Sequence, residues 1–362
     1  QERRAWSRST RRQGGEMDKA LVTGAAGFLG QHLVHRLLER GDKVRALDIS
    51  VPEGLPEGLP EGHIDGAELM AAGAHGKGWI AGDIRGAEWI AADIRDAEAV
   101  ASACKGMDTV YHLASLIPQR KANVETMRAV NIGGTKNVLD AARNAGLRRA
   151  VYLSSAEIFG VPKVVPCPED GELAPLGEYG RNKIEAERLC REACAAGLPV
   201  VMLRPPTITG SGLNEPFILS LLSAIQKGKP VTLLGKGTNR FQFIHVDDVV
   251  DACLLAAEHP DAAGEAFNIG GKDVPSIAEL VHLVASAVGS PSKVKLIPTT
   301  PAKIAIALLR PFGAAPLEPE HVAIAICDYV FDWSKAQRML GWEPRWSVAD
   351  ALIDTYRSIY GG

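Results

Sequence analysis

The sequence predicts an α/β fold: a doubly wound parallel sheet followed by a smaller C-terminal substrate-binding region. Two observations predict it. Residues 20–34 join an apolar run to a glycine-rich turn and then to a helical pattern. Through the amino-terminal half, short apolar runs alternate with amphipathic stretches, which is the pattern of strands alternating with helices. A chain of 362 residues, 46% hydrophobic and 23% charged, is long enough for about two globular domains.

The glycine-rich turn is the first element in chain order. Gly24, Gly27 and Gly30 follow the apolar run at three-residue spacing, and Phe28 and Leu29 open the helical pattern. Such glycines permit a tight turn, a close approach of backbone to pyrophosphate, and close packing of helix on strand. Phosphates then lie at the helix N-terminus, where free N–H groups favour negative charge. The turn therefore predicts a Rossmann-type dinucleotide site.

Asp48 ends the second apolar run, about twenty residues after the turn. A carboxylate at this point accepts hydrogen bonds from an adenosine ribose and repels a 2′-phosphate. No arginine follows closely, so we predict NAD rather than NADP as the cofactor. The alternative is that Asp48 is simply a loop carboxylate after a strand.

A tandem duplication follows: WIAGDIRGAE at residues 79–88 is nearly repeated by WIAADIRDAE at residues 89–98. Only one copy can fill a given place in the sheet. The second copy runs on into an amphipathic helix, so we place it there, with Asp93 and Ile94 flanking the adenine. Asp83 and Ile84 are the alternative. The Pro- and Gly-rich section of about residues 50–78 reads as a mobile surface insertion.

Two further strands end at the ligand-binding edge of the predicted sheet. The run TVYHLA at residues 109–114 brings Ala114 to this edge, and a strand over residues 149–153 brings Ser154 and Ser155 to it. Helices are expected between these strands, over residues 124–144.

Tyr179 and Lys183 stand four residues apart in a segment with helical periodicity, so their side chains share one helix face. A neighbouring ammonium stabilises tyrosinate, which lets the phenol act as acid or base near neutral pH. Ser155 is suited to hold the substrate oxygen. An isolated YxxxK pair is common on exposed helices, but its position after a dinucleotide turn and the SSAEIFG strand end favours catalysis.

Together, the motifs TGAAGFLG, DIRD, YHLAS, NIGGTKNVLDAA, LSSAEIFG, YGRNK, LRPPTITG, FIHVDDVV, FNIGG and LGWEPRWS resemble, in order, those of the extended short-chain dehydrogenase/reductases, the NAD-dependent epimerase/dehydratase group. The resemblance implies an NAD-dependent dehydrogenase or epimerase, usually a homodimer joined through the YxxxK helix and the helix before it. It implies that Ser155, Tyr179 and Lys183 are catalytic. The cofactor residues it implies are Gly24, Gly27, Phe28, Leu29, Gly30, Asp48, Asp93, Ile94, Ala114, Lys183, Pro206 and Thr207, with Pro205 adjoining them.

The substrate branch depends on the segment before the VDD motif. Sugar-nucleotide epimerases carry an arginine five residues before its valine; here that residue is Phe241, and Arg240 precedes it. A one-residue shift in an extended segment turns a side chain to the opposite face. We therefore favour the 3-beta-hydroxysteroid dehydrogenase-like branch, with nucleotide-sugar epimerase as the alternative. The apolar residues 304–309, Ile324 and Ile326 then either line a substrate pocket or pack helices.

Several polar residues near the predicted catalytic residues have other interpretations. Sugar-nucleotide dehydratases carry an aspartate where this chain has Ala156, so dehydration is not expected and Glu157 reads as a polar neighbour. His245 with Asp247 and Asp248 lacks a third ligand at suitable spacing, so no metal is expected. Instead an aspartate is expected to cap a helix that begins at Val249.

Composition limits the remaining possibilities. The net charge of −3 gives no reason to expect nucleic acid as a partner, and no apolar run is long enough to cross a bilayer. Six scattered cysteines fit a reducing cytoplasm. A non-catalytic dinucleotide-binding sensor is a second class of function, disfavoured because the Tyr and Lys pair is present.

We expect a disordered leader at residues 1–16 before a natural start at Met17. We expect an NAD-binding domain over residues 17–205, to which about residues 241–270 return. Residues 206–240 and 271–362 are expected to form the substrate-binding region.

Overall fold

The structure is a computed structural model, and it describes residues 17–52, 83–117, 123–299 and 323–361. The expected leader, most of the expected insertion and the apolar residues 304–309 lie outside the described residues. The chain divides into two compact units. The first comprises Gln1–Ser154, Asn182–Leu203 and Val250–Ala266, and the second comprises Ser155–Arg181, Arg204–Val249 and Phe267–Gly362. Residues 155–181, expected within the NAD-binding domain, are thus grouped with the second unit.

A seven-stranded sheet forms around the first unit, in the order β10-β6-β5-β4-β1-β2-β3. Its strands are β1 (Lys19–Thr23), β2 (Lys43–Asp48), β3 (Glu88–Ala91), β4 (Thr109–His112), β5 (Arg149–Leu153), β6 (Val200–Arg204) and β10 (Ala266–Asn268). The pairs from β3 through to β6 are all parallel, and β1 pairs with both β2 and β4. The predicted doubly wound parallel sheet is therefore confirmed.

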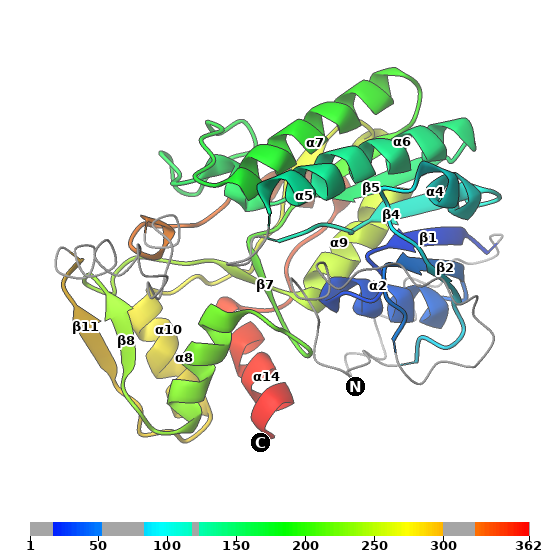
Figure 1. The fold of residues 1–362 in the computed structure, drawn as a ribbon. Coiled ribbons are helices and arrows are strands. Elements are labelled where there is room, and N and C mark those ends of the chain that lie inside the picture. Colours follow the sequence, from blue (N-terminus) through cyan, green and yellow to red (C-terminus); the bar gives the residue numbers. More distant parts are fainter. Residues whose placement is uncertain (1–16, 53–82, 118–122, 300–322, 362) are drawn as a thin grey trace. The chain divides into compact units, whose positions relative to one another are not determined.

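Helices cover both faces of this sheet (Figure 1). They are α2 (Phe28–Glu39), α4 (Ala97–Cys104), α5 (Val124–Arg128), α6 (Thr135–Asn144), α7 (Glu178–Ala195) and α9 (Val246–Glu258), with a short 3-10 turn at Pro260–Ala262. On one face, α4, α6 and α7 bury apolar residues such as Val100, Val138 and Ala186 in a common core. Ion pairs from Arg36 to Asp251 and from Arg40 to Glu258 join α2 to α9.

The helices expected over residues 124–144 are present, but a π-helical turn, Ala129–Gly134, separates α5 from α6. π-Helical turns inside α-helices are rare and occur often at functional sites.

The second copy of the duplicated segment supplies β3, as predicted, and its Trp89 is buried. The described part of the first copy repeats one local structure of the second: Asp83 accepts hydrogen bonds from the backbone and guanidinium of Arg85, as Asp93 does from Arg95. The sequence DIR therefore forms the same contact between aspartate and arginine twice.

The second unit contains two small parallel ladders. β7 (Thr207–Thr209) pairs with β9 (Phe243–His245), and β8 (Val231–Leu234) pairs with β11 (Val294–Ile297). Its other elements are α8 (Pro216–Gln226), α10 (Ile277–Ala287), α13 (Ser334–Leu340), α14 (Val348–Tyr360) and a 3-10 turn, Ala156–Phe159. Among the described residues, no helix has the length and apolarity required to cross a membrane.

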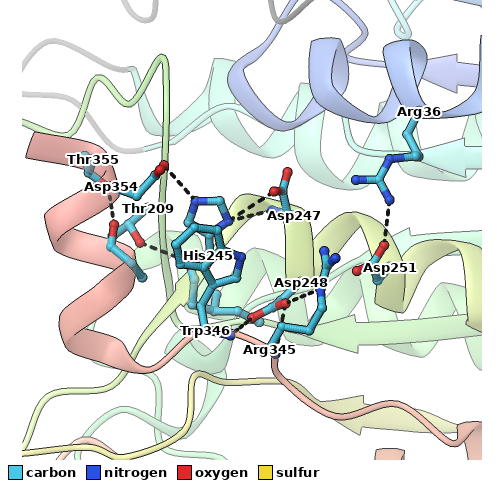
Figure 2. A network of polar contacts seen from close by, with 12 residues as sticks. Arg36, Thr209, His245, Asp247, Asp248, Asp251, Arg345, Trp346, Asp354 and Thr355 are labelled. Atoms are coloured by element: carbon cyan, nitrogen blue, oxygen red, sulfur yellow. Dashed lines mark hydrogen bonds and ion pairs between the residues drawn. The ribbon is translucent and has the colours of Figure 1, made fainter. Parts of the chain in front are cut away.

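A polar network fixes the C-terminal segment of the second unit (Figure 2). The carboxylate of Asp248 accepts hydrogen bonds from the backbone N–H groups of Arg345 and Trp346, at 3.1 and 3.2 Å. The ring of Trp346 stacks on His245, whose Nε2 contacts Asp354 at 3.2 Å. The expectation that an aspartate caps a helix beginning at Val249 is wrong, because α9 begins at Val246 and places Asp248 inside its first turn, where its side chain binds the C-terminal segment.

Candidate active site

The glycine turn after β1 has no room for a side chain at Gly24 or at Gly30. Gly24 has a φ of +71°, and a Cβ on it would lie 2.7 Å from the backbone nitrogen of Ala114. A Cβ on Gly30 would lie 2.1 Å from the carbonyl oxygen of Gly24. Helix α2 begins after Gly27 with no side-chain cap and no acidic residue in its first turn. Its N-terminus therefore fits the phosphates of a dinucleotide.

Asp48 ends β2 beside this turn. Its carboxylate accepts hydrogen bonds from the backbone N–H groups of Ala26, at 3.0 Å, and Ser50, at 3.2 Å. Burial raises the pKa of Asp48 to about 6, against the lowering effect of these donors. These hydrogen bonds hold the side chain at the turn.

Two other sequence-predicted cofactor residues lie on the loop after β3. The carboxylate of Asp93 is held by Arg95, at 2.9 Å from Nε and 2.6 Å from Nη2. Ile94 is buried, and its backbone oxygen accepts a hydrogen bond from the side chain of Asn137 at 3.0 Å. Helix α6 therefore holds the loop that presents both residues.

Lys183 is 2% exposed and donates a hydrogen bond from Nζ to the backbone oxygen of Leu153, at 2.8 Å. Its ammonium also lies 4.9 Å from the centre of the Tyr152 ring. One turn further along α7, the buried Glu187 accepts a hydrogen bond from the Ser154 hydroxyl at 2.7 Å. These contacts fasten α7 to the end of β5, immediately before Ser155.

In the second unit, Ser155 caps the 3-10 turn Ala156–Phe159 by accepting a hydrogen bond from the backbone N–H of Glu157 at 3.1 Å. A Cβ on Gly180 would lie 2.7 Å from the carbonyl oxygen of Glu157, so this turn and the start of α7 pack with their backbones in contact. Ser155 and Tyr179 are each 9% exposed. The structure thus brings the Ser155 turn to the helix end that carries Tyr179, one helical turn before Lys183.

The backbone oxygen of Pro205 accepts a hydrogen bond from Ala156, and the next two residues, Pro206 and Thr207, lead into β7. These residues belong to the second unit, whereas the glycine turn, Asp48, Asp93, Ala114 and Lys183 belong to the first.

An aromatic cluster surrounds the segment before the VDD motif. Phe241 stacks on Tyr329, with ring centroids 5.2 Å apart, and also contacts Phe243 at 4.9 Å. Tyr329 meets Phe331 edge to face at 4.7 Å. Burial raises the pKa of the Tyr329 phenol well above its ordinary value, and the charges of Glu157 and of ionised Tyr179 act in the same direction. The cluster is therefore near the predicted catalytic tyrosine.

The side chain of Arg240 contacts Asp328, whereas that of Phe241 packs in the aromatic cluster. Its guanidinium forms an ion pair with Asp328 at 3.0 Å, and both side chains are more than a third exposed. The neighbouring backbone N–H of Arg240 also binds Asp328, at 2.7 Å.

Sequence reasoning missed a set of buried polar residues in the first unit: Thr23, Asn131 and Thr135, with His112 between them. The histidine in the middle of the otherwise apolar run TVYHLA was the one signal in the sequence, because an imidazole inside a strand must find hydrogen-bond partners.

This arrangement defines an α/β protein with a Rossmann-like parallel sheet. The sequence profile described as the NAD dependent epimerase/dehydratase family matches residues 20–270. The chain therefore belongs to this family, as its motifs predicted; it is an NAD-dependent enzyme of the dehydrogenase and epimerase type.

Its relatives fall in both substrate branches. The chain is 32% identical to an uncharacterized protein, y4nG, of Sinorhizobium fredii, over 93% of this chain and 77% of that protein. It is 30% identical to a 3 beta-hydroxysteroid dehydrogenase/Delta 5-->4-isomerase of Mycobacterium tuberculosis, over 94% and 90% respectively. The solved structure of MoeE5 in complex with UDP-glucuronic acid and NAD is 28% identical, with a TM-score of 0.71, over 94% of this chain and 98% of that one.

Proposed function

We propose that this enzyme oxidises a secondary alcohol on an apolar ring to a ketone, in the manner of a 3-beta-hydroxysteroid dehydrogenase. The observation that carries the proposal is the aromatic cluster of Phe241, Tyr329 and Phe331, because Phe241 occupies the position where sugar-nucleotide epimerases carry a diphosphate-binding arginine. Tyr329 and Phe331 are at most 2% exposed, so the apolar surface that the cluster offers is the half-buried ring of Phe241. An apolar ring suits an apolar substrate better than a charged diphosphate. The Mycobacterium relative, at 30% identity, supports this branch.

In the proposed mechanism, Tyr179 takes the proton of the substrate hydroxyl and Ser155 orients its oxygen. Lys183 stabilises the tyrosinate, since a cation one helical turn away favours the ionised phenol. The residues that we assign to NAD would hold it beside the substrate, where it would supply the acceptor for the hydride of the alcohol carbon. The fold fits this cofactor because a Cβ on Gly24 or Gly30 would collide with the turn that we assign to its pyrophosphate.

We assign the cofactor to twelve residues: Gly24, Gly27, Phe28, Leu29, Gly30, Asp48, Asp93, Ile94, Ala114, Lys183, Pro206 and Thr207. The ribose hydroxyls of the adenosine would donate to Asp48. We also propose that the enzyme is a cytoplasmic homodimer, which sedimentation and cell fractionation would check.

A nucleotide-sugar epimerase is the second candidate, and one observation favours it. The Arg240 guanidinium is accessible, and its ion pair with Asp328 is partly exposed, so it is available to a diphosphate. In that case the same Ser155, Tyr179 and Lys183 act, and the hydride returns to the other face of the ketone.

The experiment is an NADH-formation assay on two panels, 3-beta-hydroxysteroids and UDP-hexoses, with epimerisation of the hexoses followed by chromatography. The proposal expects NADH from the steroids and no epimerised hexose. Tyr179→Phe should lower kcat by about a hundredfold to ten-thousandfold, whereas Tyr360→Phe, at the end of α14, serves as the matched control. Epimerised UDP-hexose without steroid oxidation would replace the proposal by the second candidate.

A further inference from the structure

Four buried polar residues of the first unit are hydrogen-bonded in series, and the last hydrogen bond runs from the Thr135 hydroxyl to the backbone oxygen of Asn131. Thr23 ends β1, His112 ends β4, Asn131 lies in the π-helical turn and Thr135 begins α6, and each is at most 2% exposed. The Thr23 hydroxyl lies 2.7 Å from His112 Nδ1, and His112 Nε2 lies 2.9 Å from the Thr135 hydroxyl. We call these four residues the His112 chain.

The hydrogen bond of the Thr135 hydroxyl decides which atom donates in each of the other hydrogen bonds of the His112 chain. The Thr135 hydroxyl donates its single proton to the backbone oxygen of Asn131, at 2.7 Å. Toward His112 it is therefore an acceptor, so His112 Nε2 carries the proton and Nδ1 accepts from Thr23. The imidazole is held in one neutral tautomer.

The surroundings keep this imidazole neutral. Burial lowers the pKa of His112 to about 3, and the positive charge of Lys183 acts in the same direction. The Tyr152 ring contacts both residues, with its centre 5.6 Å from the His112 ring and 4.9 Å from Lys183 Nζ. A second proton on His112 would repel the ammonium that the proposed mechanism requires.

Both ends of the His112 chain bind the backbone of the loop after β4. The Thr23 end also adjoins the glycine turn. Leu113 donates to the backbone oxygen of Thr23 at 3.1 Å, and Ala114 donates to its hydroxyl at 3.5 Å. At the other end, the Asn131 amide binds both backbone groups of Leu116, at 2.7 and 2.9 Å. The Ser115 hydroxyl donates to the same amide at 3.1 Å.

We propose that His112 is a positioning residue for NAD: it fixes the glycine turn after β1 against residues 114–116 through Thr23 at one end and Thr135 with Asn131 at the other. This inference rests on the proposed placement of NAD at Gly24 and Ala114. The two backbones are already so close that a Cβ on Gly24 would collide with Ala114, so a small displacement of either alters the cofactor surface.

The test compares two substitutions of His112. His112→Gln keeps one donor and one acceptor at similar spacing, whereas His112→Leu fills the space without either. We expect His112→Leu to raise the Kd for NAD, measured calorimetrically on folded protein, by more than about tenfold and to change kcat at saturating NAD by less than about threefold. His112→Gln should restore most of the affinity. The matched control is His245→Leu, which removes a buried and hydrogen-bonded imidazole from the second unit.

Two results would overturn the inference. One is an unchanged Kd for NAD in His112→Leu together with a lower Tm, which would make the His112 chain a purely structural element. The other is a 15N NMR spectrum of the wild-type protein in which the His112 ring is protonated at Nδ1, or becomes doubly protonated between pH 5 and 8. The NMR result does not depend on NAD, whereas a wild-type protein that fails to bind NAD would contradict the proposed function itself.

Discussion

Phe241 lies almost parallel to Tyr329, with an interplanar angle of 26° between their rings. Under the proposed function, Phe241 would form part of the apolar substrate surface, and Tyr329 would support its ring from the buried side. Phe241→Leu should therefore lower kcat/KM for a hydroxysteroid by about threefold to tenfold, because an aromatic pair contributes about 0.5–1.5 kcal/mol beyond burial. Steady-state kinetics with the steroid panel checks this.

The matched variant for this prediction is Phe241→Tyr, which preserves the stack and should retain most of kcat/KM. If Phe241→Leu were as active as the wild-type enzyme, the aromatic cluster would have no part in substrate recognition.

NAD binding should weaken at acidic pH because of Asp48. Burial raises the pKa of this carboxyl from 3.8 to about 6. A ribose donates hydrogen bonds best to the charged form, so the affinity should fall below about pH 6, by at most about tenfold per pH unit for one proton. Calorimetric titration of NAD from pH 5 to 8 measures this.

Asp48 has the opposite effect on the stability of the free protein. Its folded-state pKa lies above the ordinary 3.8, so its stabilising contribution is present below that pH and is lost as the pH rises through about 6. Asp48→Asn should remove its part of both pH dependences. A wild-type NAD affinity that does not vary between pH 5 and 8 would contradict the assignment.

Gly30 should tolerate no side chain. An alanine Cβ there would lie 2.1 Å from the carbonyl oxygen of Gly24 and 2.8 Å from the backbone of Ala25. Gly30→Ala must push α2 away from the turn, at a cost of about 1–3 kcal/mol in unfolding free energy, and should weaken NAD binding. Denaturant unfolding and calorimetry measure the two effects.

The control is Gly133→Ala, where nothing lies within 4 Å of the added Cβ. It should unfold and bind NAD nearly as the wild-type protein does. Equal behaviour of the two alanine variants would count against close packing at the turn.

Asp248 should be a strong contributor to stability. Its removal leaves the backbone N–H groups of Arg345 and Trp346 without the acceptor that Asp248 supplies. Asp248→Ala should therefore cost about 2–4 kcal/mol, measured by urea unfolding. The neighbouring Asp247→Ala is the control, because Asp247 is a quarter exposed and lies 3.7 Å from His245 Nδ1. Similar losses of unfolding free energy in both variants would show that the network does not depend on Asp248.

The first unit could be predicted from the sequence because its signals are local. Apolar runs, the glycine turn and the helical period each specify an element by itself, and parallel pairing of consecutive strands follows from alternation with helices. The same reasoning placed Ser155 directly after β5, where its side chain caps the following turn. The contact of Lys183 Nζ with the backbone oxygen of Leu153 was not predicted.

The second unit depends on contacts that are distant in sequence, and periodicity cannot supply these. β7 pairs with β9, and the carboxylate of Asp248 binds residues almost a hundred positions later. The error over Asp248 has this origin: local capping rules describe where aspartate is favoured, whereas its actual partners come from the C-terminal segment. The π-helical turn was likewise missed because its residues fit an ordinary helical pattern.

The duplicated segment enters the sheet at β3, which is the last strand in the order and, among the described residues, pairs with β2 alone. Ten extra residues at an outer strand disturb no second neighbour, whereas the same duplication at β1 would have to be accommodated between two partners. The margin of the sheet is therefore where this fold can accommodate ten extra residues. The added copy is itself anchored there, because Ile84 is fully buried and its backbone oxygen accepts a hydrogen bond from Trp89 Nε1 at 3.3 Å.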